Sequence, residues 1–346
     1  MVEEQQTLSA DDARVLLERI LAGEATDLEL ASLLGGLSAR GETADELVGF
    51  ASAMRAAAHS LPLTAAEQDD LVDTCGTGGD GTGTFNISTA AALVAAAAGA
   101  RVAKHGNRAV TSKCGSADVL EALGIPISLA PAAAAEALRR HNFCFLLAPA
   151  HHPAMKAVLP VRRALGVRTI FNVLGPLLNP AGARRQVMGV YAARLVPVVG
   201  QAMLQLGVRH AFVVHGEGGL DELSLSGPSE VAEVLNAGLA GSGSRLRLYR
   251  VAPEDLGLQR APLHALQGAE DAAGNAAILA EVLGLGDGQP ETGARRDVVL
   301  LNTAAVLVAA GQAPDLLAGV RLAAQAIDSR AVKTLVHALR ATKEPT

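Results

Sequence analysis

The spacing of apolar and polar positions along the chain changes in character near residue 70. Before that point, apolar residues recur three and four positions apart, as in the segment 15–21, and no alternating strand pattern appears. Ser9 precedes an acidic turn, and Thr26 and Thr43 mark two more helix starts, because a side-chain oxygen at such a position caps free backbone N–H groups. The pattern therefore predicts a small all-helical domain over residues 1–69.

From residue 70 to residue 346, short β-type runs alternate with alanine-rich helical runs such as the one at 89–100. Strands are predicted at 71–74, 102–103, 143–147, 186–190, 210–214, 245–249 and 297–300. This alternation is typical of a larger α/β domain with a mainly parallel central sheet and helices on both faces. Small and polar residues at 237–244 interrupt the pattern and predict a loop.

Three polar clusters follow predicted strands, where the carboxyl ends of a parallel sheet form ligand sites. The first, 76–81, matches the G-x-G-x-x-G pattern of dinucleotide-binding folds. That pattern also requires an acid at the end of the next strand, which here ends in Lys104 and His105. No Gly-Lys-Ser/Thr follows, so a P-loop is excluded. Two interpretations remain: an anion-binding loop, or a tight turn followed by an ordinary helix cap at Ser88 or Thr89.

Asp80 and the residues after the second strand favour the anion-binding loop. Phosphate repels a carboxylate, so Asp80 has another role: to bind a sugar hydroxyl, to help hold a metal or to form the turn itself. Lys104 supplies a mobile positive charge and Arg108 a planar guanidinium, and both groups suit a diphosphate. The amide of Asn107 can donate and accept hydrogen bonds. Hydroxyls, a further cation and a glycine continue at 111–116, which makes a plain solvated loop the weaker interpretation.

The remaining candidates are weak when each is taken alone. The adjacent carboxylates Asp221 and Glu222 are hard oxygen ligands that suit Mg²⁺, although acid pairs are also common on surfaces. His151 and His152 cannot share one helix face, so a substrate-pocket or structural role is favoured over a metal site. Three arginines lie close together in the sequence after these histidines. An arginine can bind a substrate carboxylate through two hydrogen bonds, although at least one of the three can instead belong to a solvent-exposed helix face. These arginines are Arg162, Arg163 and Arg168.

Composition and charge narrow the classes of function. Half of the 346 residues are apolar, and 29 basic against 35 acidic residues give a net charge of −6, which does not favour nucleic acid as a partner. Residues 1–8 lack a signal-peptide pattern, and the longest apolar run, 90–98, is too short to span a bilayer. Three cysteines without C-x-x-C spacing fit a reducing compartment. We therefore expect a cytoplasmic protein without a membrane partner.

Eight segments in a fixed order carry a resemblance to a known family: 73–80, 84–89, 104–108, 115–120, 168–172, 174–177, 215–216 and 221–222. Together they resemble the anthranilate phosphoribosyltransferases of tryptophan biosynthesis, over about residues 10–340. The resemblance implies a fold like that of nucleoside phosphorylases and phosphoribosyltransferases, usually a homodimer, in which about 162–182 completes the helical domain. It also implies the substrates phosphoribosyl pyrophosphate (PRPP) and anthranilate, with Mg²⁺ as cofactor.

The same resemblance implies the site residues. The residues implied for PRPP are Gly76, Gly79, Asp80, Thr84, Asn86, Ser88, Thr89, Lys104 and Ser112. The other implied substrate-binding residues are Ile87, His105, Gly106, Asn107, Arg108, Ala109, Val110, Thr111, Ser116, His152 and Arg162. Among all of these, Asn107 and Arg162 are expected to contact anthranilate, and Lys104 and Arg162 are the implied catalytic residues. The implied Mg²⁺ ligands are Ser88, Asp221 and Glu222.

Departures from the family pattern are minor, and two rival functions stay open. Gly83, Thr111 and Leu178 replace more usual residues, but none of these changes removes a proposed ligand. A pyrimidine-nucleoside phosphorylase shares the fold and would cleave a nucleoside with phosphate, although segments 86–89 and 105–107 favour the transferase. A non-catalytic relative that binds nucleic acid would need a basic groove, and the net charge of −6 speaks against it.

Overall fold

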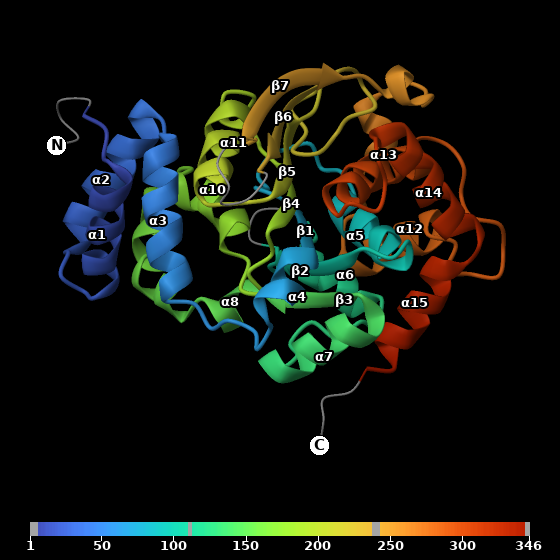
Figure 1. Cartoon of the computed structure of the whole chain (residues 1–346), viewed down its shortest axis with the longest axis horizontal. Helices are drawn as coiled ribbons and strands as arrows, with labels where there is room; N and C mark the ends of the chain where they lie inside the picture. Colours follow the sequence, from blue (N-terminus) through green and yellow to red (C-terminus); the bar gives the residue numbers. More distant parts are fainter. Residues whose placement is uncertain (1–5, 110–112, 237–242, 343–346) are drawn as a thin grey trace.

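The computed structural model describes residues 6–109, 113–236 and 243–342. Its first elements are the helices α1 (Ala10–Leu21), α2 (Asp27–Arg40) and α3 (Ala44–Ala56), drawn in blue at one end of the molecule in Figure 1. The Ser9 side chain accepts from the N–H of Asp12, and Thr26 and Thr43 form reciprocal capping boxes with Glu29 and Glu46. The helical beginning of the chain, predicted from these caps and the apolar spacing, is confirmed.

The larger domain is built on one seven-stranded sheet with the order β3-β2-β1-β4-β5-β6-β7. Its strands are β1 (Leu71–Gly76), β2 (Arg101–Gly106), β3 (Phe143–Leu147), β4 (Arg185–Gly189), β5 (His210–His215), β6 (Ser229–Leu235) and β7 (Arg245–Val251). The first five strands pair in parallel, and β6 and β7 add an antiparallel edge. The predicted α/β fold with a mainly parallel sheet is therefore confirmed.

Helices cover both faces of this sheet (Figure 1). The helices that follow α3 along the chain are α4 (Ala65–Asp70), α5 (Ile87–Ala97), α6 (Ser116–Ala122), α7 (Pro131–His141), α8 (Ala148–His151), α9 (Leu159–Leu165), α10 (Ile170–Leu174), α11 (Leu195–Gln205), α12 (Ala272–Val282), α13 (Ala294–Ala309), α14 (Leu316–Asp328) and α15 (Ala331–Arg340). Strand side chains alternate between faces: Phe143 and Phe145 belong to the apolar cluster that includes α5 and α13–α15, whereas Cys144 and Leu146 belong to the cluster that includes α7. Among the described residues, every helix falls short of the length and apolar character that a membrane span needs.

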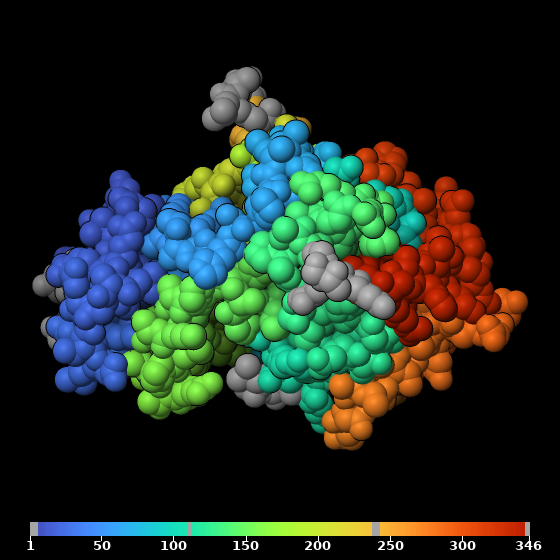
Figure 2. Space-filling view, turned by 90° about the horizontal axis from the view of Figure 1, so that it is seen from below, coloured from blue at the N-terminus to red at the C-terminus, as the bar shows by residue number. Residues whose placement is uncertain are grey.

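The helical end of the molecule rests on a later part of the chain. α9 and α10 contact α2, and α10 and the 3₁₀ turn Gly175–Leu178 contact α3. One apolar cluster joins Leu47 and Phe50 of α3 to Val161 and Phe171, and it continues onto the sheet under α11. Figure 2 shows the blue and green segments adjoining on the molecular surface.

Two sequence predictions need correction. The strand expected at 297–300 is wrong, because these residues belong to α13 (Ala294–Ala309), which is buried almost all round and so has no polar face to reveal a helical period. The strand β6, where Glu230 and Glu233 interrupt the apolar run, was not predicted. Most of the loop expected at 237–244 lies outside the described residues.

Candidate active site

The carboxyl ends of β1, β2, β4 and β5 meet at one edge of the sheet. Gly76 at the end of β1 is in register with Gly189 at the end of β4, and β2 and β5 lie on either side of this pair. The loops that follow these strands carry the glycine stretch, Asn107 and the acid pair Asp221–Glu222. The structure thus brings together three clusters that are far apart in the sequence.

The glycine stretch turns sharply and binds an acid through its backbone. Gly78, Gly79 and Gly81 have φ values of 68°, 70° and 74°, a region that favours glycine. The N–H of Gly78 donates to Oδ2 of Asp221 at 2.7 Å. Asp80 accepts from both the N–H and the hydroxyl of Thr82, at 3.1 and 2.7 Å, so its carboxylate shapes the turn. The N–H of Asp221 also points to Asp80, at 3.4 Å.

Close backbone approach fixes the position of the acid pair. Oε1 of Glu222 accepts from the N–H of Ser88 at 3.0 Å, which ties the pair to the first turn of α5. A Cβ at Gly189 would lie 1.5 Å from the carbonyl oxygen of Asp221, and one at Gly76 would lie 2.2 Å from its Oδ2. Both positions therefore require glycine in this arrangement.

Asn302 of α13 binds the backbone of Leu223, the residue directly after the acid pair. Its Oδ1 accepts from the N–H of Leu223 at 2.9 Å, and its Nδ2 donates to the carbonyl of Leu223 at 3.0 Å. The side chain is 1% exposed. Sequence reasoning missed this residue, although one asparagine inside a long apolar helix is a detectable signal, because a buried amide requires partners.

Lys104 places its ammonium between β1 and α5. Its Nζ donates to the carbonyl of Thr74 at 2.6 Å and to Oγ of Ser88 at 3.2 Å, and the side chain is 1% exposed. Burial lowers the pKa of Lys104, and nearby acids including Asp73 and Glu222 oppose that shift. The ammonium and the acid pair thus form one buried polar centre.

This centre fits a divalent cation. Burial raises the pKa of Asp221, with a further rise from Asp80, and burial raises the pKa of Glu222, with a further rise from Asp221. A cation beside two such carboxylates would relieve both effects. Among the described residues, no three His, Cys, Asp or Glu side chains gather closely enough to hold a metal ion alone. The donor set therefore matches Mg²⁺, which commonly takes one or two carboxylates together with substrate phosphates.

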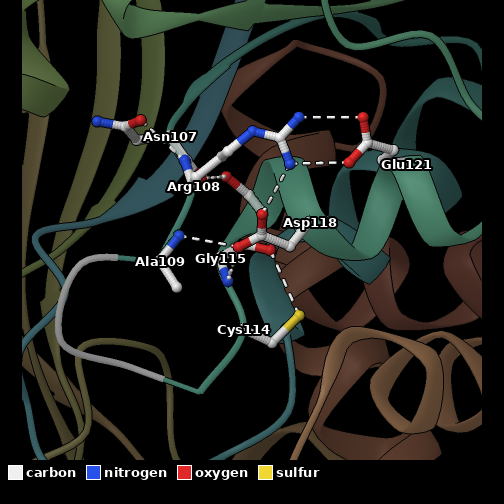
Figure 3. Close-up of polar contacts among 8 residues, drawn as sticks. Asn107, Arg108, Ala109, Cys114, Gly115, Asp118 and Glu121 are labelled. Atoms are coloured by element: carbon white, nitrogen blue, oxygen red, sulfur yellow. Dashed lines mark hydrogen bonds and ion pairs between the residues drawn. The ribbon is translucent and has the colours of Figure 1, made fainter.

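The loop after β2 places its residues in two different directions (Figure 3). The guanidinium of Arg108 pairs with Glu121, at 2.8 and 3.0 Å, and with Asp118 at 3.1 Å. These two acids engage the guanidinium of Arg108, which the sequence had suggested for a diphosphate. Val110, Thr111 and Ser112 lie outside the described residues.

One contact joins this loop to the start of α5, and another brings its two ends together. Asn86, the residue before α5, donates from Nδ2 to the carbonyl of Cys114 at 3.2 Å. A Cβ at Gly106 would lie 2.3 Å from Oγ of Ser116, which itself donates to the carbonyl of Asn107 at 3.3 Å. The other predicted residues of this region lie at the base of the glycine loop, at the start of α5 or on the loop after β2. They are Thr84, Ile87, Thr89 and Ala109.

Two buried histidines carry unused polar atoms. The rings of His105 and His152 lie 5.2 Å apart between centroids. Nε2 of His105 and both ring nitrogens of His152 are buried without a hydrogen-bond partner in the described structure. Burial and neighbouring histidines lower the pKa of His105 to about 3 and of His152 to about 4, so both rings are neutral near pH 7. By contrast, His151 bonds through Nδ1 to the carbonyl of His59 at 2.8 Å, which is a structural role.

The three arginines have separate environments. Arg162 of α9 lies over the ring of Phe171, with its guanidinium carbon 5.4 Å from the centroid, and no carboxylate of the described residues pairs with it. Arg163 is exposed. Arg168 stacks on Tyr191 at 4.3 Å and donates to the carbonyl of Gly79. Arg162 thus differs from the other two in being partly buried, with its guanidinium against an aromatic ring and without a carboxylate partner among the described residues.

Comparisons with known proteins give matches over nearly the whole chain. Residues 68–332 match the glycosyl transferase family, a/b domain, and residues 2–58 match its helical bundle domain. The anthranilate phosphoribosyltransferase of Chloroflexus aggregans is 49% identical over 332 residues, which cover 96% of this chain and 93% of that relative.

Solved structures show the same likeness. The anthranilate phosphoribosyltransferase from Thermus thermophilus matches with a TM-score of 0.87 at 42% identity, over 99% of this chain and 97% of that chain. The anthranilate phosphoribosyltransferase from Saccharomyces cerevisiae in complex with PRPP and Mg matches with a TM-score of 0.81 at 29% identity, over 95% of this chain and 92% of that chain.

Proposed function

The chain belongs to the glycosyl transferase family that contains the anthranilate phosphoribosyltransferases, and from this premise we propose that it transfers the phosphoribosyl group of PRPP to the amine of anthranilate. The products are N-(5-phosphoribosyl)anthranilate and pyrophosphate, and the step belongs to tryptophan biosynthesis. One observation carries this proposal: a glycine loop, a buried lysine and a buried acid pair converge at one edge of the sheet.

The proposed binding of PRPP follows from the donors at this edge. In the reaction, the anthranilate amine attacks the anomeric carbon as its bond to pyrophosphate breaks, and negative charge grows on the leaving group. Lys104 stabilises that charge together with N–H groups of the glycine loop other than those of Thr77 and Gly78, which already have partners, because these donors are fixed in place before the reaction. Mg²⁺ held by Ser88, Asp221 and Glu222 would supply further charge stabilisation.

The proposed binding of anthranilate uses the other side of the site. Arg162 holds the carboxylate, since its guanidinium has no acid partner among the described residues. Asn107 donates to the same substrate. The unpartnered nitrogens of neutral His105 and His152 can accept from its amine. The amine is already a nucleophile, so alignment of the two substrates rather than a strong base is what these side chains provide.

A fluorescence assay tests the proposed reaction. Anthranilate fluorescence should fall with time when the protein is mixed with PRPP and Mg²⁺, and omission of any one component should abolish the change. A protein that leaves anthranilate unchanged but cleaves a pyrimidine nucleoside with phosphate would contradict the proposal.

The Arg162→Ala variant is expected to raise the KM for anthranilate by about ten- to a hundredfold, which is the usual value of a charge-assisted hydrogen bond. The KM for PRPP should change little, because the PRPP donors lie on other elements. Arg163→Ala is the matched control, since this neighbouring arginine is exposed. Equal effects on both KM values would remove Arg162 from the carboxylate site.

The double variant Asp221→Asn, Glu222→Gln is expected to raise the Mg²⁺ concentration for half-maximal rate by at least about tenfold. Titration of the rate with Mg²⁺, and of the free protein with Mn²⁺ followed by electron paramagnetic resonance, measures the change. Glu217→Gln, at an exposed acid of the same segment, is the control. A titration that matches the wild type would remove the acid pair from the metal site.

We propose the following organisation of the chain. The helical domain comprises residues 1–69 completed by about 162–182, and the α/β domain comprises 70–346; the packing of α9 and α10 on α2 supports this division. The chain acts in the cytoplasm as a homodimer. Exposed apolar side chains near the helical end support the dimer, and light scattering measures its mass. These side chains are Val15, Leu28 and Val167.

A further inference from the structure

Asp118, in the first turn of α6, closes the base of the loop that follows β2 (Figure 3). Its Oδ2 accepts from the N–H groups of Ala109 and Gly115, both at 2.9 Å, and its Oδ1 accepts from Arg108 at 3.1 Å. One carboxylate therefore holds both stems of the loop together and holds the arginine beside them.

These contacts exceed what a helix cap requires. A cap satisfies the N–H groups of its own helix end, as the bond from Gly115 does. The bonds from Ala109 and Arg108 instead reach nine and ten positions back along the chain. A Cβ at Gly115 would lie 2.4 Å from the nitrogen of Ala109, so the two stems approach as closely as glycine allows.

The same arrangement fixes which face Asn107 presents. Its backbone carbonyl accepts from the N–H of Ala117 at 3.2 Å and from Oγ of Ser116 at 3.3 Å. Its side-chain Oδ1 accepts from the N–H of Arg108 at 2.8 Å. The amide oxygen thus already accepts one bond, whereas the NH₂ donor has no partner among the described residues, and Figure 3 shows this nitrogen pointing away from the cluster.

We propose that Asp118 is a positioning residue that orients the Asn107 amide as a donor toward the substrate, by holding together the two stems of the loop that carries Asn107. The inference rests on the proposed function, because that function supplies the substrate that Asn107 contacts. Asp118 itself touches no substrate. It acts through the stem 107–109, in which the backbone N–H of Arg108 engages the Asn107 oxygen.

The ionised form of Asp118 is the one that the loop stabilises. Burial acts to raise the pKa of Asp118, but the two backbone N–H groups and the guanidinium of Arg108 outweigh that effect, so the pKa is lowered. A neutral side chain at this position is expected to hold the loop less well. An amide offers only one acceptor oxygen, and its NH₂ group would face the donor of Arg108.

A graded series of variants tests the proposal. Asp118→Asn is expected to raise the KM for anthranilate by about threefold and Asp118→Ala by about tenfold, since one and then all of the charge-assisted bonds are lost. The KM for PRPP and kcat should change less, because the glycine loop and Lys104 are untouched. Glu121→Gln is the matched control: it weakens the Arg108 pair but keeps the bonds to Ala109 and Gly115. It should leave both KM values within about twofold.

Two outcomes would overturn the inference. One is an unchanged KM for anthranilate in Asp118→Ala while the wild type is active. The other is a uniform loss of kcat that tracks a fall in Tm, which would indicate a merely structural residue. A wild type without turnover would overturn the proposed function instead. In that case, amide hydrogen exchange decides the inference: Ala109 and Gly115 must exchange faster in Asp118→Asn than in Glu121→Gln, and equal exchange overturns it.

Discussion

The Gly189→Ala variant is expected to lose at least about 10²-fold in kcat/KM for PRPP, because misplacement of reacting groups by about 1 Å can have an effect of that size. The added Cβ would lie 1.5 Å from the carbonyl oxygen of Asp221, so the backbone of the acid pair must move. The displacement reaches the glycine loop as well, since Gly78 donates to the same aspartate. Initial rates at varied PRPP and Mg²⁺ measure the loss.

Two companion variants separate this effect from general damage. Gly76→Ala clashes chiefly with the end of the Asp221 side chain, and its Cβ lies 3.1 Å from the backbone oxygen of Asp221 instead of 1.5 Å, so a smaller loss is expected. Gly35→Ala has open space around its Cβ on α2 and should keep full activity, with stability raised by about 0.5–1 kcal/mol. Circular dichroism distinguishes a folded, inactive Gly189→Ala from an unfolded one. Wild-type rates in Gly189→Ala would contradict the proposed position of the acid pair.

Local patterns account for most of what the sequence predicted. Helix caps such as Ser9 and Thr26 act within three or four residues, so they can be read directly from the chain. The clusters at the ends of β1, β2 and β5 were also predictable, because parallel strands end at one edge. That rule predicts that Gly78 and Asp221 lie at the same edge of the sheet, but it does not predict the hydrogen bond between them.

The partners of the site residues were not predictable, because they come from distant segments. Asn302 reaches Leu223 across 79 positions, and only the packing of α13 under the sheet brings them together. Arg108 was expected to face a diphosphate, yet Glu121 on the next helix competes for its guanidinium. The helix 294–309 itself was misread in part, since burial on all sides removes the periodicity on which prediction depends.

The Lys104→Met variant is expected to lower kcat by about 10²–10³-fold, the usual effect of removing one prearranged donor from developing negative charge. The ammonium of Lys104 is also the positive charge beside the buried carboxylates Asp73 and Glu222. Methionine fills a similar volume but removes that positive charge from the two acids. Removal of one partner from a buried charged group commonly destabilises a protein by about 3–5 kcal/mol, so a lower Tm is expected as well.

The pH dependence of that destabilisation identifies its cause. Burial raises the pKa of Asp73 to about 6, although Lys104 and hydrogen bonds oppose the rise. Without Lys104 this pKa rises further, so the folded variant binds a proton that the unfolded chain does not bind at the same pH. The free energy of unfolding lost in Lys104→Met should therefore be smaller at pH 6 than at pH 8, by about 1.4 kcal/mol for each unit of pKa change. Lys333→Met, which breaks a surface pair with Asp287, should show a small loss with no such dependence. A pH-independent loss in Lys104→Met would show that the lysine acts through packing rather than through its charge.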